Sequence, residues 1–271
     1  MAKTRIGTCF DSLAASGRTA LIPYIMAGDP NPNASVPLMH TLVENGGDLI
    51  ELGVPFSDPM ADGPVIQAAG ERALHHRVSL HDVINTVAEF RLKNNDTPVV
   101  LMTYQNPIEV MGEMQFVKSA VKAGVDGVLV VDLPVEEADV LLKATEHEAL
   151  DIIFLVSPTT TNDRLKRIAQ VASGFLYYVS LKGVTGAKHI DMEQIADKVK
   201  QFKNIITIPT AVGFGIHDAQ HARQVAQLAD AVVVGSAIVR IIEQHANADY
   251  CQNVADFVAT LRSAMDAEIG D

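Results

Sequence analysis

The segment DLIELGVPF (48–56) has the composition of a buried β-strand but contains one carboxylate inside the run, Glu51. Side chains alternate between the two faces of a strand, so Ile50, Leu52 and Val54 share one face. This branched apolar face suits packing against helices. Glu51 then points to the opposite side, where a charged carboxylate is costly unless it is paired or neutralised.

Similar apolar runs recur along the chain and alternate with amphipathic helical segments. The runs are ALIPYIMAG (20–28), DLIELGVPF (48–56), PVVLMTYQN (98–106), DGVLVVDLP (126–134), DIIFLVSPT (151–159), GFLYYVSL (174–181), IITIPTAVGFG (205–215) and DAVVVGSA (230–237). Near-continuous apolar strands between helices are typical of a parallel sheet covered by helices. Eight consecutive units predict a closed (β/α)₈ TIM barrel, with an open doubly wound sheet as the alternative architecture. Glu51 would then point into the barrel.

The whole chain, residues 1–271, is predicted to form a single barrel domain. Its hydrophobic fraction of 48% is enough to bury a large core, and no segment has the composition of a linker. The leading segment TRIGTCFDSLAASG (4–17) has no strand before it. We therefore expect an extra N-terminal helix that covers the bottom of the barrel.

Charge and composition limit the possible partners. The net charge of −12, from 21 Lys and Arg against 33 Asp and Glu, argues against binding to nucleic acid or to an anionic membrane surface. No apolar stretch approaches the roughly 20 residues of a membrane span, and the N-terminus lacks the apolar region of a secretory signal. With only Cys9 and Cys251, the chain suits a reducing cytoplasm.

Glu51 is the first candidate catalytic residue. None of the predicted strands contains a Lys or Arg that could pair with it. Burial without a cation raises the pKa of a carboxyl, which prepares it for acid–base chemistry near neutral pH. The alternative is a structural carboxyl that is hydrogen-bonded to an inward tyrosine such as Tyr104 or Tyr177.

Two more carboxylates follow in the loop SDPMADGP (57–64). Asp62 stands just before Pro64 at a predicted helix start, so it could act only as a helix cap. Asp58 precedes Pro59 and could act only as a turn former. In another alternative, Glu51, Asp58 and Asp62 together bind Mg²⁺, although their spacing matches no fixed metal-binding motif.

Glycine-rich motifs follow the last three predicted strands: GVTGA (183–187), GFGI (213–216) and GSAIV (235–239). In barrels, the loops after strands seven and eight often bind phosphate through backbone amides at a helix start. A phosphate facing a carboxylate across the barrel predicts a phosphosugar-like substrate that undergoes proton transfer or carbon–carbon cleavage. The lack of an inward strand lysine argues against Schiff-base chemistry, and the lack of a metal cluster argues against a metal-dependent aldolase.

The stretch ELGVPFSDPMADGPVIQAA (51–69) resembles the signature of tryptophan synthase alpha chains. The resemblance continues in order through PYIMAGDP, MTYQNP, DLPVEE, GVTGA, VGFGI and GSAIVRII. It implies a (β/α)₈ barrel without a cofactor or metal of its own, which cleaves indole-3-glycerol phosphate into indole and glyceraldehyde 3-phosphate. It also implies a beta chain that carries pyridoxal phosphate and receives the indole within an α₂β₂ complex.

Matched motif by motif, the resemblance makes Glu51 the catalytic glutamate and Asp62 the catalytic aspartate. The other implied residues are Tyr24, Met102 and Leu155 at the indole pocket, Tyr177 facing the substrate, Thr185 as the lid threonine, Gly186, Gly215, Gly235 and Ser236 as phosphate-binding amides, and Asp58 as a contact with the beta chain. The stretch from Gly183 to His189 is expected to be a mobile lid. Some family members have an arginine in the lid where this chain has Leu181-Lys182. The sequence therefore does not decide whether a salt bridge forms in the lid.

The cleavage needs a proton at indole C3, removal of a glycerol hydroxyl proton and stabilisation of the cationic ring nitrogen. We expect Glu51, buried and able to change its protonation, to move the protons. Asp62, ionised in a wetter loop, would stabilise the nitrogen. Two alternatives remain: another phosphosugar barrel such as an isomerase or epimerase, and a catalytically silent regulatory subunit of a beta chain.

Overall fold

The computed structural model describes residues 4–179, 192–213, 215–246 and 249–267. Eight strands pair in parallel in chain order, and the last returns to the first to close a barrel. The strands are β1 (Ala20–Met26), β2 (Ile50–Gly53), β3 (Val99–Thr103), β4 (Gly127–Val130), β5 (Asp151–Val156), β6 (Leu176–Val179), β7 (Thr210–Gly213) and β8 (Ala231–Val234). The predicted TIM barrel is confirmed, and the doubly wound alternative is wrong.

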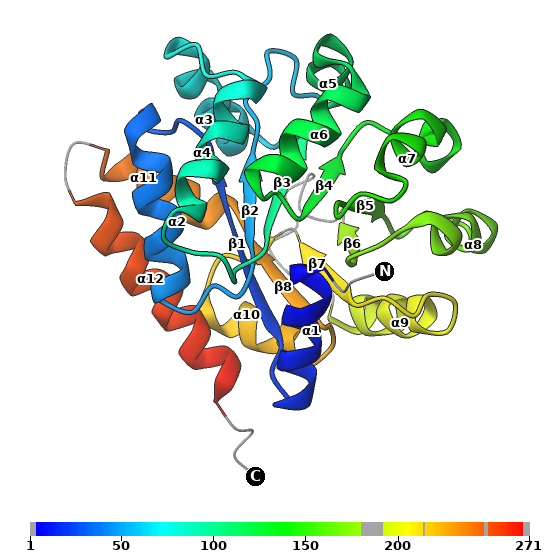
Figure 1. Ribbon diagram of the computed structural model, residues 1–271. Coiled ribbons are helices and arrows are strands. Elements are labelled where there is room, and N and C mark those ends of the chain that lie inside the picture. Colours follow the sequence, from blue (N-terminus) through cyan, green and yellow to red (C-terminus); the bar gives the residue numbers. More distant parts are fainter. Residues whose placement is uncertain (1–3, 180–191, 214, 247–248, 268–271) are drawn as a thin grey trace.

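Helices surround the strands on the outside of the barrel (Figure 1). The surrounding helices are α2 (Ser35–Glu44), α3 (Pro64–His75), α4 (Leu80–Arg91), α5 (Gln105–Met111), α6 (Glu113–Ala123), α7 (Asp139–Thr145), α8 (Asn162–Val171), α9 (Met192–Lys203), α10 (Ala219–Ala226), α11 (Ser236–Gln244) and α12 (Tyr250–Asp266), with 3₁₀ turns η1 (Pro32–Ala34) and η2 (Val135–Glu137). A further helix, α1 (Arg5–Ala15), precedes β1. Two helices, rather than one, follow each of β2, β3 and β8. No helix within the described ranges combines the length and apolarity needed to cross a membrane.

Each predicted apolar run contains one strand, but the strands are shorter than the runs. β2 has four residues and ends at Gly53, although the apolar run continues to Phe56. Residues 54–56 of this run begin the loop at the carboxyl end of β2, which is the end of a TIM barrel where active sites form.

The two faces of β2 are buried against different neighbours. Ile50, Leu52 and Val54 belong to the large apolar cluster shared with the outer helices. Leu49 belongs to a second cluster inside the barrel. The predicted alternation is therefore confirmed, and it directs Glu51 inward, where it is 2% exposed.

Helix α1 closes the bottom of the barrel, as expected. Ile6, Phe10 and Leu13 belong to the same internal cluster as the inward side chains of the strands. The ring centroid of Phe10 lies 5.9 Å from that of Phe175, just before β6. A salt bridge of 2.9 Å from Arg5 to Asp126 fixes the start of the helix. Because α1 covers this end, we expect a ligand to enter from the opposite end of the barrel.

Candidate active site

Glu51 lies on the inner face of β2, between the neighbouring strands β1 and β3. It is in register with Tyr24 on one side and with Val100 on the other. Its Oε1 atom is buried and has no hydrogen-bond partner among the described groups. An unpartnered carboxyl oxygen inside a barrel is costly, which is a reason to look for a function rather than a structural role.

The surroundings of Glu51 favour its protonated form. Burial is the main cause that raises the pKa of its carboxyl, to about 8, and the negative charge of Asp62 raises it further. A hydrogen bond from the Tyr177 hydroxyl opposes the rise. No Lys or Arg in the described part of the chain pairs with the carboxyl. The predicted rise in pKa is supported, and one of the two tyrosines proposed as structural partners is also present.

Asp62 lies at the end of the loop that connects β2 to α3. The N-cap of α3 is Gly63, and no side chain caps this helix, so the proposed capping role of Asp62 is wrong. Burial raises the pKa of Asp62 to about 6, while a hydrogen bond from Tyr104 lowers it. Asp62 is therefore less solvated than expected, although it remains mainly ionised at neutral pH.

Tyr104, at the start of α5, holds this loop at two further points. Its hydroxyl oxygen accepts a hydrogen bond of 3.0 Å from the backbone N–H of Ala61. Its ring lies 5.0 Å from the ring of Phe56. The sequence suggested Tyr104 as a partner of Glu51, whereas the structure assigns it to Asp62. This role could not be seen in the sequence because it depends on how the loop folds over the barrel mouth.

Asp58 lies on the exposed part of the same loop. The Ser57 hydroxyl donates a hydrogen bond of 2.6 Å to its carboxylate, and its carbonyl accepts one of 2.8 Å from the N–H of Met60. The proposed turn-forming role is therefore present. Within the described residues, the three carboxylates Glu51, Asp58 and Asp62 do not gather into a group that could hold one ion, so the Mg²⁺ alternative lacks support.

Two tyrosines cross the upper part of the barrel interior, and each lies against a glycine. A Cβ on Gly53 would lie 2.1 Å from the hydroxyl of Tyr24, and one on Gly213 would lie 2.6 Å from the hydroxyl of Tyr177. Both glycines end a strand, so the missing side chains leave room for the rings beside Glu51. Gly213 was predicted to belong to the phosphate loop as part of GFGI, and no role was predicted for Gly53.

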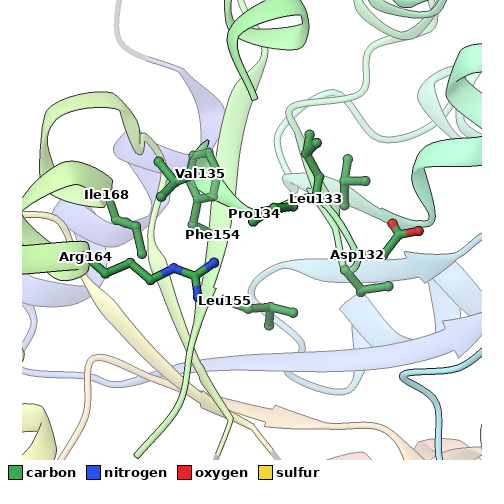
Figure 2. Close-up of a pocket in the computed structure, with 10 residues that line it drawn as sticks. Asp132, Leu133, Pro134, Val135, Phe154, Leu155, Arg164 and Ile168 are labelled. Carbon is green, nitrogen blue, oxygen red and sulfur yellow. The ribbon is translucent and has the colours of Figure 1, made fainter. Parts of the chain in front are cut away.

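Met102 and Leu155 also face the interior, as expected for a pocket that binds an apolar ring. Both pack against the internal cluster, and Leu155 is in register with Tyr177. Leu155 also lines a cavity of about 270 Å³ between the loop that follows β4, strand β5 and helix α8. Figure 2 shows Arg164 extending from α8 toward Leu155, with Asp132 on the other side. The cavity therefore adjoins the apolar side of the candidate site.

The predicted phosphate end is formed by the loops after β7 and β8. Gly235 is the N-cap of α11, Ser236 is its first residue, and no side chain caps the helix. Gly215 adopts a φ of 80°, a left-handed conformation that favours glycine. The first-turn amides of α11 are thus free to bind an anion. Thr185, Gly186, Leu181-Lys182 and the predicted lid from Gly183 to His189 lie outside the described residues.

Comparisons with known proteins agree with this geometry. The profile of the family described as "Tryptophan synthase alpha chain" matches residues 10–269. The tryptophan synthase alpha chain of Nitrosomonas europaea is 55% identical over 264 residues, covering 97% of this chain and 96% of the relative. That of Burkholderia pseudomallei is 54% identical and covers 97% of both.

Solved structures give the same result. Tryptophan synthase subunit alpha from Legionella pneumophila superposes with a TM-score of 0.92 at 45% identity, covering 98% of this chain and 99% of the other. A tryptophan synthase structure from Mycobacterium tuberculosis gives a TM-score of 0.89 at 37% identity, with 98% and 99% coverage.

Proposed function

The chain belongs to the tryptophan synthase alpha chain family, and we infer from this membership that it cleaves indole-3-glycerol phosphate into indole and glyceraldehyde 3-phosphate. The observation that carries the site assignment is the pairing of a buried, cation-free Glu51 with the nearby charge of Asp62. A closed barrel with a plugged bottom leaves this pair facing the open mouth, where a substrate enters.

We propose that Glu51 serves first as the acid that protonates the indole ring and then as the base that deprotonates the substrate hydroxyl. Its raised pKa keeps it protonated at neutral pH, so it first donates a proton to indole C3. The resulting carboxylate then accepts the proton of the glycerol hydroxyl. The oxygen forms the aldehyde C=O as the carbon–carbon bond breaks, and the bonding electrons return to the ring. Glu51 ends the cycle protonated, as it began.

Asp62 is proposed to stabilise the positive charge that develops on the ring nitrogen. With a pKa of about 6 it is mainly ionised at neutral pH, so it can accept the N–H and oppose the charge. The same negative charge also keeps Glu51 protonated, because it is one of the causes that raise the pKa of Glu51. Asp62 therefore favours the protonated form of Glu51 while it stays mainly ionised itself, so the two carboxyls take different roles.

We propose the remaining site residues from their places around the barrel mouth. Tyr24, Met102, Leu155 and Tyr177 offer apolar and aromatic surface for the indole ring. At the opposite side, the first-turn amides of α11 at Gly235 and Ser236, with the turn at Gly215, are proposed to hold the phosphate. Thr185 and Gly186 are proposed to complete the site from the lid.

Family membership implies a tryptophan synthase beta chain as the partner. We propose an α₂β₂ assembly in which pyridoxal phosphate belongs to the beta chain, while this chain carries out its own reaction without a cofactor. Asp58, exposed on the loop that also carries Asp62, is proposed to contact the beta chain. The low cysteine content supports a cytoplasmic location.

The direct test is to incubate the purified chain with indole-3-glycerol phosphate and measure indole. Wild type should release indole, while Glu51→Gln should lose at least ~10²-fold in rate. Asp62→Asn should lower kcat far more than it raises KM, because the charge on nitrogen appears only along the reaction path. Indole release by Glu51→Gln at the wild-type rate would contradict the assignment.

A further inference from the structure

Two histidines and one aspartate meet where the loop after β7 enters α10. One donor atom each from His217, Asp218 and His221 can be chosen so that all three lie within 4.8 Å of one another. His221 Nδ1 is 2.8 Å from one Asp218 oxygen, and His217 Nε2 is 3.4 Å from the other. In the described part of the chain, no other group of His, Cys, Asp and Glu gathers in this way. We propose that these three side chains bind a divalent transition-metal ion such as Zn²⁺.

The ring of His217 is already oriented for this role. Its Nδ1 lies 2.7 Å from the carbonyl oxygen of Gly215. A carbonyl can only accept, so Nδ1 carries a hydrogen, and in the neutral ring Nε2 has its lone pair on the side of Asp218. A metal-binding histidine commonly donates its other ring N–H to a backbone carbonyl, which fixes its tautomer and orientation. This contact is independent of the close approach of the three donors.

Asp218 is held in place by the helix that follows it. It is the N-cap of α10, and one carboxylate oxygen accepts a hydrogen bond of 2.8 Å from the backbone N–H of His221. The cap therefore fixes both the carboxylate and the start of the turn that carries His221. The second oxygen remains directed toward His217. The backbone thus positions the carboxylate and His221 before any ion binds. Because a carboxylate only accepts, His221 Nδ1 donates to Asp218 in the metal-free protein, and a bound ion would take the place of that hydrogen.

The donor set selects the class of ion. Two imidazole nitrogens and one carboxylate suit Zn²⁺, Ni²⁺ or Cu²⁺, whereas Mg²⁺ and Ca²⁺ prefer oxygen ligands. Tetrahedral zinc places its donors roughly 3.3 Å apart, so modest side-chain rotation would complete the site. The side chain of His217 is 52% exposed and that of Asp218 is 47% exposed, which leaves access for the ion and for a water as the fourth ligand.

The proposal is independent of the lyase reaction, since none of the three side chains belongs to the proposed catalytic pair. The test is calorimetric titration of tag-free, chelator-treated protein with Zn²⁺. Wild type should bind one equivalent, and His217→Ala and His221→Ala should each weaken binding at least ~10-fold. His81→Ala is the matched control, because His81 is also exposed and stands beside an aspartate in the first turn of a helix. It should bind as wild type does.

Asp218→Asn separates loss of metal binding from loss of folding. Asparagine caps a helix as well as aspartate does, but it lacks the negative charge. It should keep the thermal stability of the metal-free protein and lose Zn²⁺ affinity. Titration with Co²⁺ gives a second readout: the visible absorption of low-coordinate Co²⁺ should appear with wild type and be absent with His221→Ala. Wild type that binds no Zn²⁺, or alanine variants that bind it as tightly as wild type, would overturn the proposal.

Discussion

The Tyr104 hydroxyl accepts a hydrogen bond of 3.0 Å from the N–H of Ala61 and donates one to the carboxylate of the next residue, Asp62. One side chain, at the N-cap of α5, therefore holds both the backbone and the carboxylate of the loop that follows β2. This contact joins the ends of two neighbouring strands, and it makes the position of Asp62 depend on a residue more than 40 positions away.

We expect Tyr104→Phe to lower kcat by about 10-fold or more, since a hydrogen bond to a charged group contributes roughly 1.5–3 kcal/mol. The ring and its contact with Phe56 remain, so the fold should survive. Because the hydrogen bond lowers the pKa of Asp62, its loss should move the acid limb of the pH–rate profile to higher pH. Tyr250→Phe in α12 is the control. An unchanged acid limb would show that Tyr104 does not act through Asp62.

Glu51→Gln should change the pH dependence of stability. Folding raises the pKa of Glu51, so the folded state holds a proton that the unfolded chain has lost between about pH 5 and pH 8. The stability of wild type should therefore fall, relative to the variant, as the pH rises through this window, by at most about 1.4 kcal/mol per pH unit.

Urea unfolding of both proteins at several pH values measures this difference. Glu89→Gln removes the same charge from the exposed face of α4 and should show no comparable trend. A constant difference between wild type and Glu51→Gln from pH 5 to pH 8 would mean that the carboxyl is not buried as the structure has it.

Much of this site could be predicted from the sequence, because the strand period of two directs Glu51 inward once the barrel is recognised. The opening of α11 at Gly235 and Ser236 also followed from local signals. The surroundings of Asp62 could not be predicted, because its burial and its bond to Tyr104 depend on how a proline-broken loop lies on a different strand end. The role of Gly53 could not be predicted for the same reason, because the side chain that it accommodates, Tyr24, lies on another strand.

That packing leads to a prediction for Gly53→Ala. The new Cβ would lie 2.1 Å from the Tyr24 hydroxyl and 2.7 Å from its ring, and Tyr24 is only 3% exposed, so the ring must move. We expect a loss of roughly 1–3 kcal/mol in the free energy of unfolding, together with lower activity. Gly70→Ala in the interior of α3 is the contrast, because its Cβ meets only Met26 at 3.6 Å. It should gain roughly 0.5–1 kcal/mol from helix propensity. Equal stabilities of the two variants in urea would contradict the packing argument.

The phosphate assignment is tested at Gly235. Aspartate at this N-cap would place a negative charge at the amides proposed to hold the phosphate, so glyceraldehyde 3-phosphate should no longer raise the Tm of Gly235→Asp. Gly235→Ala is the matched control: its Cβ would meet Tyr24 at 3.4 Å, an ordinary contact, and it adds no charge. It should keep the protection seen with wild type. Undiminished protection of the aspartate variant would place the phosphate elsewhere.

The exposed part of the Asp62 loop leads to a prediction about the partner. Met60 is 85% exposed and Asp58 is exposed beside it, while Ala61 and Asp62 are held on Tyr104. A beta chain that binds the exposed part would therefore act on a segment that carries Asp62, the carboxylate proposed to be catalytic. We expect the isolated chain to be a slow lyase that the matching beta chain accelerates.

Asp58→Ala should reduce this acceleration and leave the basal rate nearly unchanged, because Asp58 contacts the loop only through Ser57 and Met60. The measurement is a titration of beta chain into each protein while indole-3-glycerol phosphate cleavage is followed. Asp96→Ala removes another exposed carboxylate from the loop before β3, at the opposite end of the barrel, and should be activated like wild type. If the beta chain does not accelerate wild type, the loop does not couple binding to catalysis. If Asp58→Ala is activated as strongly as Asp96→Ala, Asp58 serves only the turn.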